Sequence, residues 1–443
     1  MKNNQIQLIK NVKFFFSSFC GMSYFPNNNS IFYLGTNSVF GSYLLNSLAK
    51  SNSSTFFKNI YIVIKSILYS RNYNNHKIYK SGEEYQYNRI IVTWAFKNNF
   101  KRNGSFDDIY FKINSKNLKK TLWVVIYMSK ENPKKIDNNI VLFKPITKKS
   151  INLLYIFNFV LKNFLFIFKN FKYFLTSISN ENYFADIFLK GTNKYINSNI
   201  KFILMPYEGQ PFQNRLIEMV KKKYKKVKTI GYIHSPPKAM PSNFIYKNGC
   251  PHQIILNGND QIYCFTKFLG WKKSNIKLYP SFRFFKSNKK IKNTIFLPYF
   301  IRNTKNVIDS LKILHEKNFI NIKEFKIKNH PAALQANKNL GTIEKITILI
   351  NNLKKRNPKN TKNKFLIFIG TSGAIIESLE RGANVIHICD TPIFDVYSNK
   401  LWPSIKVKKI SRNIYIYELK KKGNLIKLGN KKYNINRIES LKA

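Results

Sequence analysis

Residues 365–389 carry the pattern that most restricts the fold of this chain. An apolar run at 365–369 is typical of a buried strand, and a polar turn, a short amphipathic stretch and Gly382 separate it from a second apolar run at 384–389. A strand, a helix and a second strand in close succession form the unit from which parallel sheets with helical cover are built. The pattern therefore predicts an α/β fold.

The turn between these strands also predicts a binding site. Thr371 and Ser372 lie where the helix begins, beside free backbone N–H groups and the positive end of the helix dipole. Gly373 has no side chain to obstruct an approaching anion. We expect a phosphate or carboxylate here, although the same hydroxyl residues also serve as ordinary helix N-caps.

Strand-like and helix-like stretches alternate along most of the chain. Further apolar runs are expected to be strands at 31–34, 90–94, 122–127, 202–205, 229–233, 254–256, 276–279, 294–297 and 325–328. Helices are expected at 212–226, 260–269, 304–317 and 342–355. A chain of 443 residues usually forms more than one domain. We predict two doubly wound, Rossmann-like domains that face a cleft, residues 1–287 and 288–443, with the boundary in the lysine-rich connection 285–293.

The charge is extreme but uninformative about sequence-specific partners. The chain has 76 Lys and Arg against 21 Asp and Glu, a net charge of +55. Lysine predominates over arginine and is spread over every segment, together with an excess of Asn, Ile, Phe and Tyr, as AT-rich coding DNA produces. No basic cluster coincides with a nucleic-acid recognition module, so we expect no nucleic-acid partner and some attraction to an anionic membrane surface.

Residues 153–177 are the most apolar stretch, but no run of eighteen uncharged apolar residues is present. Lys162, Lys169 and Lys172 fall on one helical face, which predicts an amphipathic basic helix. Such a helix either lies in a membrane interface or packs on its own domain. We expect a cytoplasmic protein, peripheral on the inner face of the cell membrane.

The sequence offers little for a metal or a redox cofactor. Cys20, Cys250, Cys264 and Cys389 have no metal-ligand spacing and are expected to be reduced thiols. The pair at 107–108 has no His or Glu at ligand spacing. The glycine fingerprint of nicotinamide enzymes is missing. We therefore expect no metal and no cofactor.

Two candidate bases directly follow predicted strands. Glu208, followed by Gly209, can accept a proton from an acceptor hydroxyl or can cap the helix that begins near residue 212. His234, held in a loop by Pro236 and Pro237, is a second candidate base or a histidine with a structural role.

The second predicted domain supplies the candidate donor-binding residues. His330, fixed by Pro331, presents an imidazole donor to a phosphate oxygen after a strand. Glu377 lies in the helix after the Thr371 turn, where it reaches the donor ribose or stays exposed. Arg283, at the end of a strand–helix–strand unit, and Pro298 are further cleft candidates, together with Gly209.

The order Glu208-Gly209, His330-Pro331 and Thr371-Ser372 over residues 200–410 resembles the GT-B-fold glycosyltransferases of bacterial surface carbohydrate and capsule biosynthesis. It is similar to sialyltransferase-like and Kdo-transferase-like members, which use cytidine-activated donors. The resemblance implies that Glu208 is the base and that His330, Thr371 and Ser372 hold the donor phosphate. It also implies a metal-independent enzyme. Tyr207 stands where those enzymes have a second acidic residue.

The resemblance implies transfer of a sugar from a nucleotide-activated donor, with cytidine as the expected base, to a surface polysaccharide or lipid-linked acceptor. The loop 233–238 is also similar to a loop of teichoic-acid polymerases, in which the histidine is the base, so His234 competes with Glu208. Two alternatives follow: transfer of a polyol phosphate from a CDP-polyol, or a non-catalytic carbohydrate-binding protein on the same scaffold.

Overall fold

The structure is a computed structural model. It describes residues 2–19, 41, 45, 48–49, 75–80, 84–146, 157, 161, 180–286, 293–298, 301, 304–316, 321–329, 340–354, 365–370 and 372–441.

The first unit is built on an eight-stranded sheet with the order β1-β4-β3-β2-β5-β6-β7-β8. All neighbouring strands are parallel except β1, which pairs antiparallel with β4 at the edge. The strands are β1 (Asn75–Lys80), β2 (Arg89–Ala95), β3 (Thr121–Tyr127), β4 (Ile140–Ile146), β5 (Phe202–Pro206), β6 (Lys228–Tyr232), β7 (Gln253–Leu256) and β8 (Ile276–Leu278).

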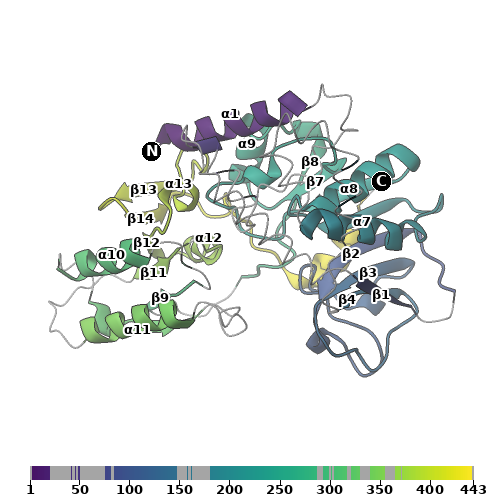
Figure 1. Ribbon diagram of the computed structural model, residues 1–443, viewed down its shortest axis with the longest axis horizontal. Coiled ribbons are helices and arrows are strands. Elements are labelled where there is room, and N and C mark those ends of the chain that lie inside the picture. The colour runs from purple at the N-terminus through teal and green to yellow at the C-terminus, as the bar shows by residue number, and fades with distance from the viewer. Residues whose placement is uncertain are drawn as a thin grey trace.

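Both faces of this sheet are buried, as its long apolar strands require. Ile90 and Val92 of β2 face one hydrophobic cluster and Ile91 faces another, because successive strand residues point to opposite faces. The helices of this unit are α7 (Asn180–Asn193), α8 (Pro211–Lys223) and α9 (Asn259–Lys267) (Figure 1).

The second unit has a six-stranded sheet with the order β10-β9-β11-β12-β14-β13. The first four are parallel, and an antiparallel hairpin completes the sheet. The strands are β9 (Thr294–Phe296), β10 (Lys326–Lys328), β11 (Phe365–Ile369), β12 (Asn384–Ile388), β13 (Ile405–Lys409) and β14 (Ile414–Leu419). The helices are α10 (Thr304–Glu316), α11 (Leu340–Lys354), α12 (Ala374–Glu380) and α13 (Pro392–Asp395).

This sheet is also covered on both faces. Ile367 of β11 lies in one cluster with the buried residues of α10 and α11, whereas Leu366 and Phe368 lie in another with those of α12. The predicted fold class, α/β with two Rossmann-like units, is confirmed. The predicted strand at 31–34 lies outside the described residues.

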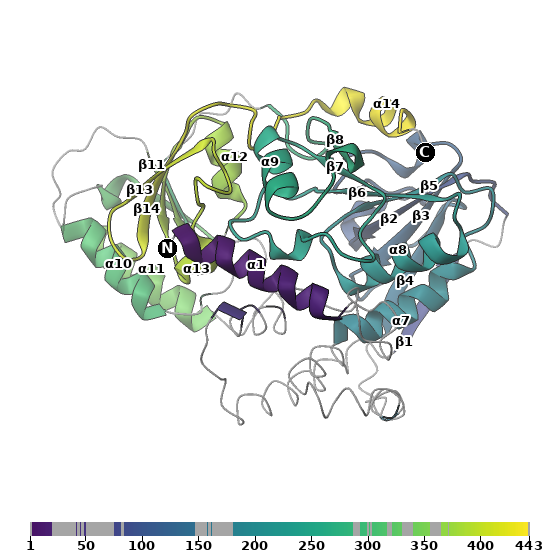
Figure 2. The ribbon, with the colours of Figure 1, turned by 90° about the horizontal axis from the view of Figure 1, so that it is seen from above.

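The N-terminal helix α1 (Lys2–Phe19) crosses between the two units (Figure 2). At its beginning, Gln5 Nε2 donates hydrogen bonds to the carbonyl oxygens of Ile393 at 3.0 Å and Val396 at 2.9 Å in the second unit. Toward its end, the Phe16 ring lies 4.8 Å from Lys247 Nζ of the first unit. The helix therefore contacts both units, which the sequence did not predict.

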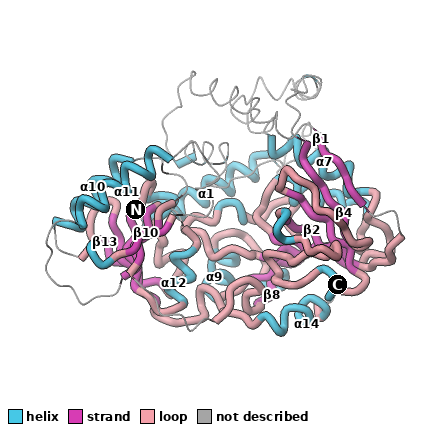
Figure 3. The backbone as a smooth tube through the Cα atoms, turned by 90° about the horizontal axis from the view of Figure 1, so that it is seen from below, coloured by secondary structure: helices cyan, strands magenta, loops and turns pink. Residues whose placement is uncertain are grey.

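The C-terminal segment returns to the first unit, where α14 (Asn434–Glu439) lies near β8 (Figure 3). Asn434 is fully buried, and its Nδ2 donates to the carbonyl oxygens of Phe111 at 2.8 Å and Phe282 at 2.9 Å. The final turns of the chain thus belong to the core of the first unit. The division between residues 287 and 288 stays a prediction.

Several expectations concern residues that the structure describes only in part. Cys250, Cys264 and Cys389 are buried free thiols. Of the predicted helix 153–177, only Phe157 and Leu161 are described, both helical and more than half exposed. Within the described ranges, no helix is long and apolar enough to cross a membrane, and no group of three or more His, Cys, Asp or Glu side chains could hold a metal ion.

Candidate active site

The candidate site lies where the parallel strands of the first sheet end. Glu208 follows β5, His234 follows β6, and Arg283 lies beyond β8. Because β5 and β6 are neighbours and parallel, the loops that follow them leave the same edge of the sheet side by side. Two residues that the sequence offered as competing bases are therefore brought together.

Glu208 and His234 form a pair in which Glu208 Oε1 lies 3.4 Å from His234 Nε2. The His234 side chain is 5% exposed and that of Glu208 is 26% exposed. The other oxygen, Glu208 Oε2, accepts a hydrogen bond from Gln210 Nε2 at 2.7 Å. The carboxylate is thus held toward His234. Gln213 Oε1 accepts hydrogen bonds from the backbone N–H groups of Glu208 and Gln210, just before α8.

This pairing determines which nitrogen of His234 carries the proton. An ionised carboxylate only accepts hydrogen bonds, so Nε2 is the protonated nitrogen and Nδ1 carries the lone pair. Nδ1 is buried and has no hydrogen-bond partner among the described residues, and the same holds for the adjacent Ser235 Oγ. An unpartnered buried acceptor is costly, so a ligand hydroxyl that reached His234 Nδ1 would gain a hydrogen bond that the protein itself does not supply.

The ionisation of the pair fits this role. Burial raises the pKa of Glu208, but the hydrogen bond and charge of His234, then Lys238 and Gln210, outweigh it and bring that pKa to about 2. Burial lowers the pKa of His234, and Glu208 opposes that effect only in part. At neutral pH the pair therefore consists of a carboxylate and a neutral imidazole, the arrangement in which an imidazole accepts a proton.

The backbone around Glu208 holds the carboxylate in place. Gly209 has φ +72°, and a Cβ there would overlap the carbonyl oxygen of Asn243. The neighbouring Tyr207 is fully buried, and its hydroxyl donates to Asn214 Oδ1 at 2.7 Å. Tyr207 thus belongs to the core and does not contribute a second acidic function.

Tyr110 is a site residue that the sequence did not reveal. Its ring centroid lies 4.4 Å from that of His234, edge to face. The guanidinium carbon of Arg283 lies 5.7 Å from the Tyr110 ring centroid. Asp108 positions this ring, because its Oδ1 accepts from the backbone N–H of Tyr110 at 2.8 Å. Asp-x-Tyr in the loop after β2 was the available signal, but Asp108 was weighed only as a metal ligand.

The second unit meets this loop from the other side. A Cβ added at Gly373, the N-cap of α12, would lie 3.2 Å from Cγ and Cδ of Pro236, so little room exists there for a side chain. Ser372 Oγ accepts from the backbone N–H of Ala374 at 3.3 Å, and thus serves as a local cap. The Tyr397 hydroxyl donates to the carbonyl oxygen of Pro237 at 2.9 Å. The strand ends of the two units therefore meet at the loop that carries His234.

The remaining candidates are dispersed within the second unit. Pro298 is buried beneath Gly370, where an added Cβ would lie 3.5 Å from the proline ring. Glu377 Oε1 pairs with the Arg381 guanidinium at 2.6 Å. Three further candidates, His330, Pro331 and Thr371, lie outside the described residues.

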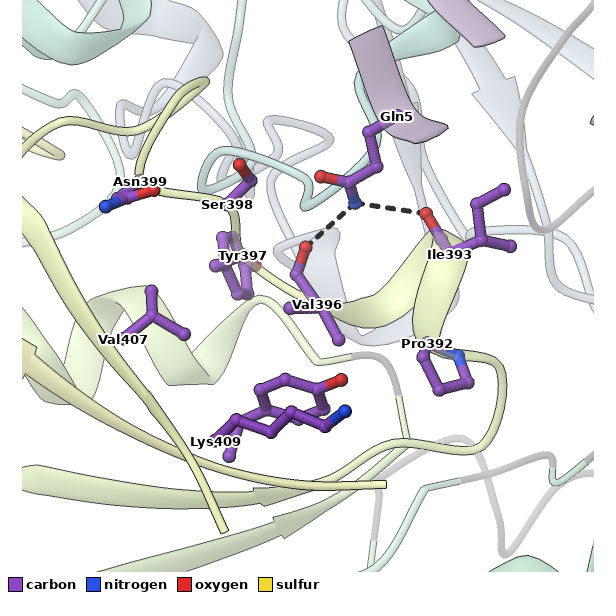
Figure 4. Close-up of a pocket in the computed structure, with 10 residues that line it drawn as sticks. Gln5, Pro392, Ile393, Val396, Tyr397, Ser398, Asn399, Val407 and Lys409 are labelled. Carbon is purple, nitrogen blue, oxygen red and sulfur yellow. Dashed lines mark hydrogen bonds between the residues drawn. The ribbon is translucent and has the colours of Figure 1, made fainter. Parts of the chain in front are cut away.

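A separate apolar cavity of about 240 Å³ lies between α1, α13 and the β13–β14 hairpin. Figure 4 shows the two hydrogen bonds of Gln5 at its wall. Tyr397, Val407 and Tyr415 also line this cavity. None of the described candidate residues does, so it is distinct from the Glu208–His234 site.

No family model and no curated protein sequence matches the chain. Among solved structures, the crystal structure of alpha,alpha-trehalose 6-phosphate synthase from Burkholderia multivorans is similar over 68% of this chain and 85% of that chain, with a TM-score of 0.38 and 8% sequence identity. The assignment of the α/β fold rests on the two sheets themselves, and the chemistry of the site rests on its side chains.

Proposed function

We propose that the chain is a glycosyltransferase that moves a sugar from a nucleotide-activated donor, with cytidine as the expected base, to a saccharide or lipid-linked acceptor. The observation that carries this proposal is the Glu208–His234 pair with its unpartnered Nδ1. The pair lies at the strand ends of the first sheet, close to the loop in which Pro236 faces Gly373 of the second unit. A donor in the second unit and an acceptor in the first would meet at this point.

The proposed chemistry is a direct displacement. His234 Nδ1 accepts the proton of the acceptor hydroxyl while the hydroxyl oxygen attacks the anomeric carbon. The bond from that carbon to the donor phosphate breaks, and the nucleotide leaves with the electron pair on its phosphate oxygen. Glu208 holds the imidazole in the required tautomer and stabilises the imidazolium that forms. His330, Thr371 and Ser372 would hold the leaving phosphate.

Two observations bear on the rival functions. The free nitrogen of His234 supports a catalytic role over a purely carbohydrate-binding one. Exposed Phe157 and Leu161, four residues apart, support an interfacial position for the helix predicted at 153–177 and hence a lipid-linked acceptor on an inner membrane face. Metal independence and the cytoplasmic location remain predictions.

A nucleotide screen tests the donor part of the proposal. We expect CMP or CDP to raise the melting temperature more than UDP or GDP, because a ligand that binds only the folded state stabilises it by about 2.7 kcal/mol at a hundred times its Kd. Gly373→Val, which places a side chain against Pro236, should reduce this shift. Gly341→Val is the control, because a Cβ at Gly341 would have no neighbour within 4 Å.

Transfer assays then separate the reactions. Turnover of CDP-glycerol but of no nucleotide sugar would replace the proposal by the polyol-phosphate alternative. The absence of any nucleotide-specific shift would contradict both enzymatic functions.

A further inference from the structure

His387 is a fully buried histidine of the second unit that the proposed chemistry does not use. It belongs to β12, and its Nε2 lies 2.9 Å from the carbonyl oxygen of Gly370, the residue that follows β11. A carbonyl oxygen only accepts hydrogen bonds, so Nε2 carries the proton and Nδ1 carries the lone pair. Burial lowers the pKa of His387 to about 4, so the imidazole is neutral at pH 7. Its two nitrogens therefore have fixed and opposite hydrogen-bonding roles.

Two buried tyrosines continue the hydrogen bonds that begin at His387. The Tyr417 hydroxyl of β14 lies 3.1 Å from His387 Nδ1 and donates to it, because that nitrogen is the acceptor. The same hydroxyl accepts from the backbone N–H of Tyr397 at 3.2 Å. Cys389 Sγ also lies 3.5 Å from His387 Nδ1, but a thiol is the weaker donor. His387, Tyr417 and Tyr397 thus form a continuous set of hydrogen bonds, the buried network.

The buried network connects two segments of the second unit that both meet the loop of the candidate base. At one end, the Tyr397 hydroxyl donates to the carbonyl oxygen of Pro237 at 2.9 Å. At the other end is Gly370, which begins the turn that leads to Gly373, and Gly373 faces Pro236. Gly370 has φ +67°, a conformation that other residues rarely adopt. Two consecutive prolines are therefore contacted by segments that the buried network holds together.

This connection matters for the alignment of the proposed reaction. The turn at 370–373 is the predicted phosphate site, and His234 is the proposed base. A misplacement of about 1 Å between reacting groups can lower a rate by about a hundredfold. Each side-chain nitrogen and oxygen of the buried network has a hydrogen-bond partner, so its geometry is well determined.

We infer that His387, Tyr417 and Tyr397 are positioning residues that fix the phosphate turn of the second unit against the base loop of the first. The inference rests on the proposed function and adds the residues that align its two halves. The three side chains act through the carbonyl oxygens of Gly370 and Pro237. Their role requires no contact with a substrate.

Hydrogen exchange, followed by mass spectrometry, measures the connection without any substrate. His387→Phe removes the donor to Gly370 and the acceptor for Tyr417. It should speed exchange both at the turn 370–373 and at the amides on either side of Pro236 and Pro237, by about fivefold, as the loss of one hydrogen bond predicts. Tyr397→Phe removes only the hydroxyl that bonds to Pro237, so it should speed exchange in the base loop alone.

Two further variants make this measurement decisive. His387→Gln keeps an N–H donor, so its exchange should lie between wild type and His387→Phe. Tyr417→Phe removes a single oxygen atom and breaks the same connection, so it gives the same test where His387→Phe does not fold. An unchanged base loop in both His387→Gln and Tyr417→Phe would overturn the inference.

Tyr415→Phe is the matched control. Tyr415 is also buried in β14, and its hydroxyl donates to the carbonyl oxygen of Arg412 at 3.3 Å, outside the buried network. The variant should leave exchange at the turn and at the base loop close to wild type. Equal changes in Tyr415→Phe and Tyr417→Phe would mean general loosening of the second unit and would also overturn the inference.

Steady-state kinetics separate positioning from stability. With a donor identified by the nucleotide screen, Tyr397→Phe should lower kcat by roughly ten- to a hundredfold and leave the KM for the donor unchanged, because only the base loop is released. His387→Phe should also raise the KM for the donor, because the turn that holds its phosphate shifts. A purely structural role would lower the melting temperature of both variants without changing kcat or KM.

The two measurements distinguish this inference from the proposed function. Linked exchange at the turn and the base loop, in a protein that responds to no nucleotide, would contradict the proposed reaction alone. Transfer activity with a wild-type kcat in Tyr397→Phe, together with unlinked exchange, would contradict the positioning role alone.

Discussion

His234→Ala is expected to lower kcat/KM for sugar transfer by about 10²–10⁴-fold at neutral pH, the usual contribution of a positioned general base. The lone pair on Nδ1 is lost, and no other buried histidine nitrogen in the described part of the chain lacks a hydrogen-bond partner. Donor binding should be retained, because the candidate donor residues belong to the second unit. Steady-state kinetics with a donor identified by the nucleotide screen, together with the melting temperature, measure this outcome.

His252→Gln is the matched control. His252 Nδ1 accepts a hydrogen bond from the backbone N–H of Thr229 at 3.0 Å and lies 2.8 Å from Thr229 Oγ1. This histidine thus has a structural partner near the start of β6, at the opposite end of that strand from His234. The variant should keep the wild-type rate even where its stability is reduced. Full transfer activity in His234→Ala would remove His234 from the mechanism.

Glu380→Ala is expected to destabilise the folded protein by about 3 kcal/mol or more, because it leaves three buried N–H donors unpaired and each costs at least about 1 kcal/mol. Glu380 is 5% exposed and accepts the backbone N–H groups of Gly423 at 2.6 Å, Leu425 at 2.8 Å and Ile426 at 2.9 Å. Removing the carboxylate leaves three donors without a partner. The urea concentration at the unfolding midpoint measures the loss.

Two variants calibrate that measurement. Glu380→Gln keeps one acceptor oxygen and should lose less stability than the alanine variant. Glu418→Ala removes an exposed carboxylate that pairs with Lys406 at 3.0 Å, and it should cost no more than about 1 kcal/mol. Equal costs at 380 and 418 would contradict a structural role for the buried carboxylate.

The sequence predicted the parallel strands well because burial on both faces requires continuous apolar runs. Phe365–Ile369 and Asn384–Ile388 pair as expected, with α12 between them. It did not predict β4, because the apolar run at its start passes into lysine and proline. The return of the C-terminal segment depends on contacts such as the hydrogen bond from Asn434 Nδ2 to the carbonyl oxygen of Phe111, 323 residues away, which a local sequence pattern cannot indicate.

The site was predicted residue by residue but not as an arrangement. Glu208 and His234 were competing bases in the sequence, since each follows a strand and nothing in the sequence shows that those strands are neighbours. The pairing of β5 with β6 turns the competitors into one unit in which Glu208 orients His234. Tyr110 was not predicted, because Asp-x-Tyr in a loop does not show by itself that the buried carboxylate of Asp108 holds the tyrosine backbone and so places its ring against His234.

The pH dependence of kcat/KM in wild type and Glu208→Gln tests the central claim most directly. His234 has a lowered pKa, so transfer should be independent of pH near neutrality and should fall only as the pH drops through a value below 6.5, where the imidazole becomes charged. Glu208 raises the pKa of His234, so Glu208→Gln should reduce the plateau rate and move the acid limb to lower pH. An acid limb at the same pH in both proteins, or a plateau that Glu208→Gln leaves unchanged, would contradict the account.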